Sequence, residues 1–218
     1  MHQLARIHVA SLALLLLAGC GQDVAPAGAV PADGTIVDLT HTLTGESPVW
    51  PGATRFQRRQ LVGYEQGYLK YEYTLDEGIG THMDAPVHFV QGGRPVDALP
   101  VERFVAPAVV VDVSDEAASN PDYQLSVEDL RDWESAHGRI PEGAFVILRS
   151  GWAERWPDEE RYRNTDADGV MHFPGFAPAA ADFLAGERTV TGIGTDTLSL
   201  DHGPSERFRV HFTMFEHG

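Results

Sequence analysis

Cysteine is almost absent from this sequence. Cys20 is the only one among 218 residues, so no disulfide can form within the chain. A packed core must therefore hold the fold together. A chain of this length, with 43% hydrophobic and 22% charged residues, suffices for one globular domain, and no internal repeat divides it further.

Positive charge is scarce as well. The chain carries 16 Lys and Arg against 32 Asp and Glu, which gives a formal net charge of −16. Its most basic cluster is the short run at residues 55–59. Phosphate binding needs a concentrated basic surface, so nucleic acid is not expected as a partner.

Long apolar runs are also missing. The run at residues 9–18 has the length of a signal-peptide core, well short of the roughly 20 residues of a spanning helix. It ends in Leu17-Ala18-Gly19-Cys20, which resembles a bacterial lipoprotein box. The resemblance implies cleavage before Cys20, acylation of that residue and a membrane anchor through its lipid. The alternative is an ordinary secretory signal followed by a chance cysteine.

The same resemblance predicts a location and domain boundaries. No aspartate follows Cys20 directly, which resembles the signal for the outer membrane, so we expect a lipid-anchored protein at its periplasmic face. Residues 20–34 are rich in Ala, Pro and Gly, as flexible tethers are. We expect a signal peptide at 1–19, a tether at 20–34 and one folded domain at 35–218.

Both strands and helices are predicted along the expected domain. Strands are predicted at residues 35–43, 67–75, 108–114 and 144–150, the last two as short apolar runs buried on both faces. One helix should begin after Ser126 and stop at Gly138, and another should run from Pro178 to Gly186. Irregular connections disfavour a doubly wound sheet. The prediction is a single α/β domain with a mixed β core and peripheral helices.

The stretch "EGIGTHMDAPVHF" at residues 77–89 concentrates chemically active side chains. In an extended segment His82 and Asp84 share one face, and Pro86 excludes a helix and fixes a turn that lets His88 return toward them. Imidazole and carboxylate are ligands of zinc and manganese, and a carboxylate can bridge two ions. A solvated polar loop rich in turn formers is the alternative.

"GTHMDAPVHF" resembles the signature of the metal-dependent cyclase family, which includes bacterial kynurenine formamidases and isatin hydrolases. The stretches "VDLTHTL", "FVILRSGW" and "FPGFAPAAADFL" match in the same order, so the resemblance covers residues 36–218. It implies the family's fold, one or two zinc or manganese ions, and a small-molecule substrate. The implied activity is hydrolysis of a C–N bond in a small amide, formamide or cyclic amide. The family also forms homodimers or larger assemblies.

Carried over residue by residue, the resemblance makes His82, Asp84 and His211 metal ligands and His88 the general acid/base. Two further ligands of the family have no counterpart. One is a histidine four residues before His82, where this chain has Gly78 and where the adjacent Glu77 is the candidate substitute. The other is a glutamate about a dozen residues after His211, so the chain is expected to be truncated at its C-terminus.

Three aromatic residues are candidates for stacking on a substrate, although core packing explains them equally well. They are Trp50, Trp152 and Phe173. Two other classes of function stay open. One is a non-catalytic, small-molecule-binding envelope lipoprotein that kept the fold and lost metal ligands. The other is a structural envelope protein that recruits a partner through its acidic surface.

Overall fold

The computed structural model describes residues 36–217, so the predicted signal peptide, the tether and Cys20 lie outside the described residues. The strands are β1 (Gln57–Val62), β2 (Lys70–Thr74), β3 (Ala108–Asp112), β4 (Gln124–Leu125), β5 (Phe145–Arg149), β6 (Gly175–Phe176) and β7 (Gly192–Thr195). The α-helices are α1 (Ser114–Ser119), α2 (Val127–His137), α3 (Glu159–Arg163), α4 (Pro178–Phe183) and α5 (Arg209–His217). A π-helical turn, η6 (Leu184–Arg188), continues α4.

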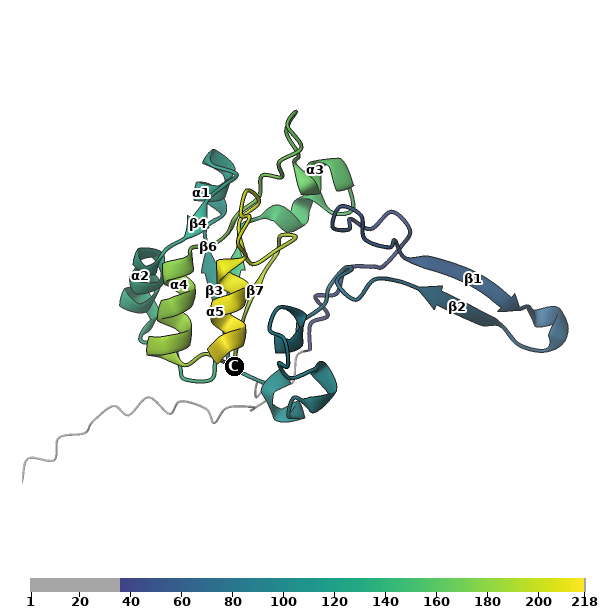
Figure 1. The fold of residues 1–218 in the computed structure, drawn as a ribbon, viewed down its shortest axis with the longest axis horizontal. Coiled ribbons are helices and arrows are strands. Elements are labelled where there is room, and N and C mark those ends of the chain that lie inside the picture. Colours follow the sequence, from purple (N-terminus) through teal and green to yellow (C-terminus); the bar gives the residue numbers. More distant parts are fainter. Residues whose placement is uncertain (1–35, 218) are drawn as a thin grey trace, which may run out of the picture.

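Parallel strands form the centre of the molecule. The main sheet has the order β3-β5-β7, and β4 pairs with β6 in a second parallel pair. Helices α2, α4 and α5 lie together beside these strands (Figure 1). The predicted α/β class is therefore confirmed. Within the described residues, antiparallel strand pairing is confined to β1 and β2, apart from a single isolated bridge.

The core lies between the helices and one face of the main sheet. Val109, Val111, Val146 and Leu148 alternate along β3 and β5 and are all buried. The prediction that both strands are buried on both faces is wrong for β3, because Val110 is 46% exposed. β3 is an edge strand with helices on one side, so its sequence is more apolar than its burial requires.

Helix α2 forms where its end signals predict it. The Ser126 hydroxyl accepts a hydrogen bond from the Asp129 N–H, and the Asp129 carboxylate accepts one from the Ser126 N–H. This reciprocal pair satisfies two backbone donors that the helix itself cannot use. Leu130 points into the core, and Gly138 closes the C-terminal end.

The strand predicted at residues 35–43 is wrong for the described part of that stretch. Residues 36–40 are exposed and belong to no sheet. β-branched residues favour an extended backbone, but a strand needs a neighbour to accept its hydrogen bonds. The segment is held instead by side chains, such as the Thr81 hydroxyl that accepts a hydrogen bond from the His41 N–H.

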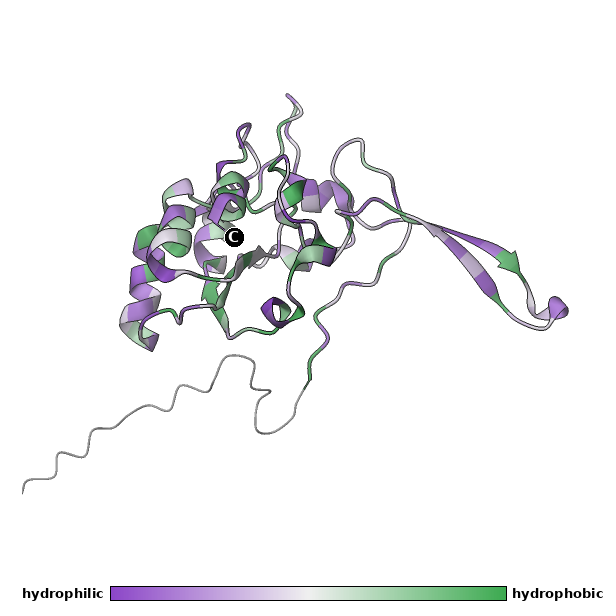
Figure 2. Ribbon diagram, turned by 60° about the horizontal axis from the view of Figure 1, so that its bottom comes forward, coloured by the Kyte–Doolittle hydropathy of each residue, from purple (hydrophilic) through white to green (hydrophobic). Residues whose placement is uncertain are grey.

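The β1–β2 hairpin projects from the rest of the molecule in both views (Figure 1, Figure 2). Its turn contains a single 3-10 turn, η1 (Tyr64–Gln66), and closes at Gly67 with a φ of 97°. None of the residues of its two strands is buried. The hairpin thus contributes nothing to the core of its own chain. No helix within residues 36–217 is long and apolar enough to cross a bilayer.

Candidate active site

A short loop anchored by buried residues carries most of the candidate site. Ile79, Ala85 and Pro86 are buried, whereas the His82 side chain between them keeps 31% of its surface exposed. Pro86 opens a single 3-10 turn, η2 (Pro86–His88), and the His88 N–H donates to the Ala85 carbonyl. The turn predicted at Pro86 is therefore present, and it fixes the backbone around Asp84.

Asp84 lies between two imidazoles. His82 Nε2 is 3.5 Å from Asp84 Oδ1, and His211 Nε2 is 3.8 Å from Asp84 Oδ2. His211 comes from α5, far along the chain from the other two residues. The structure thus brings together the three residues that the sequence predicts as metal ligands.

The Nδ1 atom of each imidazole contacts an oxygen on the side of the ring away from Asp84. His82 Nδ1 lies 2.9 Å from the Gly80 carbonyl oxygen, and His211 Nδ1 lies 2.6 Å from Asp201 Oδ2. Both of these partners are acceptors, so each Nδ1 carries a proton, and Nε2 is the nitrogen of each ring that faces Asp84. Metal-ligating histidines in proteins are commonly oriented in this way.

The two separations are longer than those of direct charged hydrogen bonds and comparable with the distance between two ligands of one ion. Charged N–H···O hydrogen bonds are about 2.7–2.9 Å long. Two ligands about 2.1 Å from a tetrahedral ion lie about 3.4 Å apart. As the side chains stand, residues 36–217 contain no group of three or more acidic, histidine or cysteine side chains that closes around an ion. The donor types are those that zinc and manganese accept, but these three side chains alone do not complete a ligand shell.

Electrostatics keep Asp84 ionised. Burial opposes its charge, but the hydrogen bond from His82 and the nearby His88 and His211 outweigh burial and lower the pKa of Asp84. In return, the Asp84 carboxylate raises the pKa of His82 against the opposing effect of burial. The site thus concentrates a carboxylate charge where a cation would bind.

His88 lies beside these three residues and faces a different partner. Its Nδ1 is 3.4 Å from Glu77 Oε1, and its side chain is 39% exposed. Glu77 therefore contacts the predicted acid/base, whereas the neighbouring Gly78 faces His82: a Cβ at position 78 would lie 3.7 Å from His82 Nε2. In this arrangement Glu77 stands outside the three-residue group that it was predicted to join.

Aromatic rings line one side of His211. Phe89 stacks on the His211 imidazole with centroids 4.6 Å apart, and Phe208 lies 5.4 Å from Phe89. Trp50 joins through Phe208, at 6.1 Å. Phe208 has a φ of 46°, a conformation that bulky residues rarely adopt. The sequence singled out Trp50 and missed both phenylalanines, although Phe89 directly follows His88.

The other two predicted aromatic residues belong to the core. Trp152 and Phe173 are 2% and 0% exposed and pack with Tyr162 and Met171 in a small cluster. The Trp152 indole donates its N–H to the Tyr162 carbonyl. Packing accounts for both rings, and this burial lends no support to a substrate contact.

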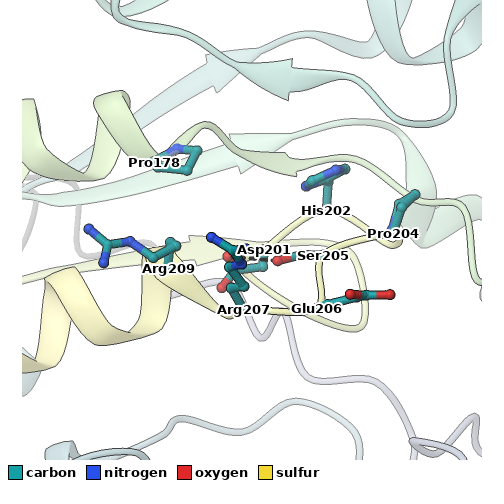
Figure 3. A pocket seen from close by; sticks show the side chains of 8 residues that line it. All are labelled: Pro178, Asp201, His202, Pro204, Ser205, Glu206, Arg207 and Arg209. Carbon is teal, nitrogen blue, oxygen red and sulfur yellow. Dashed lines mark hydrogen bonds between the residues drawn. The ribbon is translucent and has the colours of Figure 1, made fainter.

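Asp201 also lines a shallow pocket of about 330 Å³. Figure 3 shows Asp201 in this pocket with Arg209 on one side and Ser205 on the other, near the start of α5. His82, Asp84 and His211 do not line it. The pocket is therefore separate from the candidate metal ligands and shares with them only the Asp201 side chain that contacts His211. Asp201 itself gave no signal in the sequence.

Residues 37–202 match the family model Cyclase. The chain belongs to the cyclase family. Among related proteins, the isatin hydrolase of Roseibium aggregatum is 38% identical over 133 residues, which cover 59% of this cyclase-family chain and 50% of that protein. The kynurenine formamidase of Bacillus cereus is 28% identical over 191 residues, which cover 84% of this chain and 78% of that enzyme.

A solved structure agrees with this assignment. Isatin hydrolase A from Ralstonia solanacearum superposes on this cyclase-family chain with a TM-score of 0.77 at 36% identity. The superposition covers 82% of this chain and 74% of that structure. The predicted fold family is thereby confirmed. The aligned part spans half the length of the Roseibium relative.

Proposed function

We propose that this chain is a metal-dependent hydrolase that cleaves a C–N bond in a small amide, formamide or cyclic amide. The observation that carries the proposal is Asp84 between two imidazole Nε2 atoms, each ring held through its Nδ1 by an acceptor. Its relatives include an isatin hydrolase and a kynurenine formamidase, which supports hydrolysis of this bond type.

Different residues of the site would bind the metal, transfer the proton and contact the substrate. A zinc or manganese ion held by His82, Asp84 and His211 would supply Lewis-acid chemistry, which polarises a carbonyl and acidifies water. His88 accepts a proton from the attacking water and passes it to the leaving nitrogen as the C–N bond breaks. The Glu77 carboxylate, 3.4 Å from Nδ1, orients the His88 ring. Phe89, Phe208 and Trp50, whose rings are tilted against one another, offer an apolar wall to the substrate.

The test is a hydrolysis assay with isatin and an N-formyl arylamine, using protein loaded with zinc or with manganese. Turnover should stop when a chelator removes the metal. His88→Gln should lower kcat by about 10²–10⁴-fold while the bound metal, measured by mass spectrometry, stays constant. The control is His137→Gln on the exposed side of α2, which should keep the full rate. Turnover that survives both chelation and His88→Gln would contradict the proposal.

A non-catalytic binding protein of the same fold is the weaker alternative. It would bind these compounds without turning them over. The named relatives are hydrolases, and the other two predicted ligands both lie beside Asp84, so catalysis is the better supported function.

We also propose that the chain pairs with a second copy of itself. Among the described residues, sixteen of the nineteen exposed large hydrophobic side chains lie between residues 36 and 105. This half includes the hairpin, and exposed apolar surface on this scale is typical of an interface. Residues 55–75 carry four basic and two acidic side chains, whereas the rest of the chain carries 12 and 30. The hairpin thus complements the acidic surface of another copy.

Finally, we propose that the protein is lipid-anchored through Cys20 at the periplasmic face of the outer membrane. The lipoprotein-box resemblance supports this proposal. Radiolabelled palmitate supplied to a bacterial host should label the wild-type chain and leave Cys20→Ala unlabelled. Equal labelling of both chains would contradict it.

A further inference from the structure

Gly78 opens directly onto the candidate metal centre. A Cβ built at this position would lie 3.7 Å from His82 Nε2, and apart from its chain neighbours no other atom of the described residues lies within 4 Å of it. Nε2 is the nitrogen that faces Asp84. A side chain at position 78 would therefore project into the space next to the metal-facing nitrogen.

The backbone does not require glycine here. Gly80, two residues on, has a φ of 68°, which disfavours other residues, but Gly78 has no such positive φ. The residue is also exposed to solvent. Because residue 78 is glycine, the space next to His82 Nε2 is left empty of side-chain atoms. This space, called the gap below, is open to solvent.

The charge around the gap selects what can enter it. Asp84 and Glu77 both carry carboxylates here, and Asp201 holds His211 from behind. The whole chain has a net charge of −16. Beside the bound ion, an anion would be repelled by the Asp84 and Glu77 carboxylates, whereas a neutral nitrogen base would not. Neutral nitrogen is also a ligand that zinc accepts readily.

We propose that Gly78 leaves one donor position of the metal centre open, and that a small neutral nitrogen base the size of imidazole fills it from solvent. The inference rests on the proposed metal site, although not on any catalytic activity. It makes the affinity of the protein for metal depend on a second ligand.

The test is a titration of the metal-free full chain with Co²⁺, followed by the visible absorption of the bound ion, with and without millimolar imidazole. Imidazole should raise the Co²⁺ affinity of the wild-type chain about ten-fold, within the usual range of coupling between two ligands. Acetate should not. Binding of free Co²⁺ by imidazole is corrected from a protein-free titration.

Two variants at position 78 test whether the imidazole response depends on the gap. Gly78→His should bind Co²⁺ more tightly than the wild-type chain and should not respond to imidazole, because its own ring fills the gap. Gly78→Leu should lose the imidazole response without gaining affinity. Circular dichroism confirms that each variant is folded, and wild-type protein alone already tests the imidazole response.

Three results would overturn the inference. One is an unchanged wild-type affinity in imidazole. Another is an equal effect of acetate. The third is a loss of affinity in Glu77→Gln, which would show that Glu77 supplies the missing donor. If neither the wild-type chain nor Gly78→His binds Co²⁺ at all, the proposed metal-dependent function fails as well, so the two failures are distinguishable.

Discussion

Asp201 links the candidate metal centre to the start of a helix. Its Oδ2 accepts from the ring and the backbone N–H of His211, and its Oδ1 accepts from the Val210 N–H and the Ser205 hydroxyl. The side chain is buried, which opposes its charge, but these hydrogen bonds outweigh burial and lower its pKa. One carboxylate therefore caps α5 and fixes the orientation of His211.

Replacing this carboxylate should weaken metal binding without removing a ligand. We expect Asp201→Asn to lower metal affinity by about 10–100-fold, the usual effect of losing a partner that orients a ligand histidine. Equilibrium dialysis against zinc measures the change. Ser205→Ala is the matched control, because it removes one contact to the same carboxylate and leaves His211 in place. Equal affinity in both variants would contradict the role of Asp201.

The origin of each site residue explains which of them the sequence could predict. His82, Asp84 and His88 lie within seven residues of one another around Pro86, so local geometry alone brings them together. His211 was predicted only through the family resemblance. Asp201 and Phe208 contact site residues that are distant in the sequence or come from another element. A local sequence pattern does not predict such tertiary contacts.

At the scale of elements, one ion pair ties α2 to the end of η6. Glu134 accepts two hydrogen bonds from Arg188, at 2.7 and 2.9 Å, and a third from the Ile140 N–H. Chiefly through Arg188, these contacts lower the pKa of Glu134 from an ordinary 4.5 to about 2. Both side chains are largely shielded, with 14% and 10% of their surfaces exposed.

Removing this charge should destabilise the fold in a pH-dependent way. We expect Glu134→Gln to lower the free energy of unfolding by about 2 kcal/mol at pH 7, as for a hydrogen bond to a charged group. The folded-state pKa is depressed, so the stabilisation is complete above pH 4.5 and is lost as pH falls toward about 2. Urea unfolding of both chains at pH 7, 4 and 3 measures this. A difference that stays constant down to pH 3 would contradict the linkage.

The helix cap offers a second test at this scale. Ser126→Ala should lower the free energy of unfolding by about 1 kcal/mol, because the Asp129 N–H loses its acceptor. Ser135→Ala, on the exposed part of the same helix, is the control and should change the free energy by less. Thermal unfolding of the three chains separates these outcomes.

Elements with local end signals were predictable, and elements defined by tertiary contacts were not. Helix α2 carries its own cap and stop. Helix α5 has no such end signals, and "RVHFTMF" is rich in residues that favour strands. It is helical where Asp201 caps it and α4 packs against it. The stretch at 35–43 has the residue pattern of a strand, but its described part is not a strand, since no neighbouring strand pairs with it.

At the scale of the whole molecule, the two halves of the described chain differ in burial. The second half contains nearly all of the core, and the first half exposes most of the large apolar side chains. Tyr73, on the hairpin, is 56% exposed. An isolated two-stranded ribbon is marginally stable in water, which favours a partner along its length.

A charge placed on the hairpin should therefore disrupt self-association. We expect wild-type protein to elute as a dimer or larger assembly in size-exclusion chromatography with light scattering, and Tyr73→Glu to shift toward the monomer. Val170→Glu is the control, since Val170 is 39% exposed and lies outside the first half of the chain. A monomeric wild-type chain, or an equal shift in both variants, would contradict the assembly.

The hairpin also carries the sole lysine of the sequence, Lys70, exposed in β2. A reagent chosen to react with the lysine ε-amine and not with the α-amino group will therefore attach one fluorophore per molecule, at the end of the projecting ribbon. Donor-labelled and acceptor-labelled chains can be mixed without introducing any cysteine. Energy transfer between them would report, in real time, how quickly copies exchange partners.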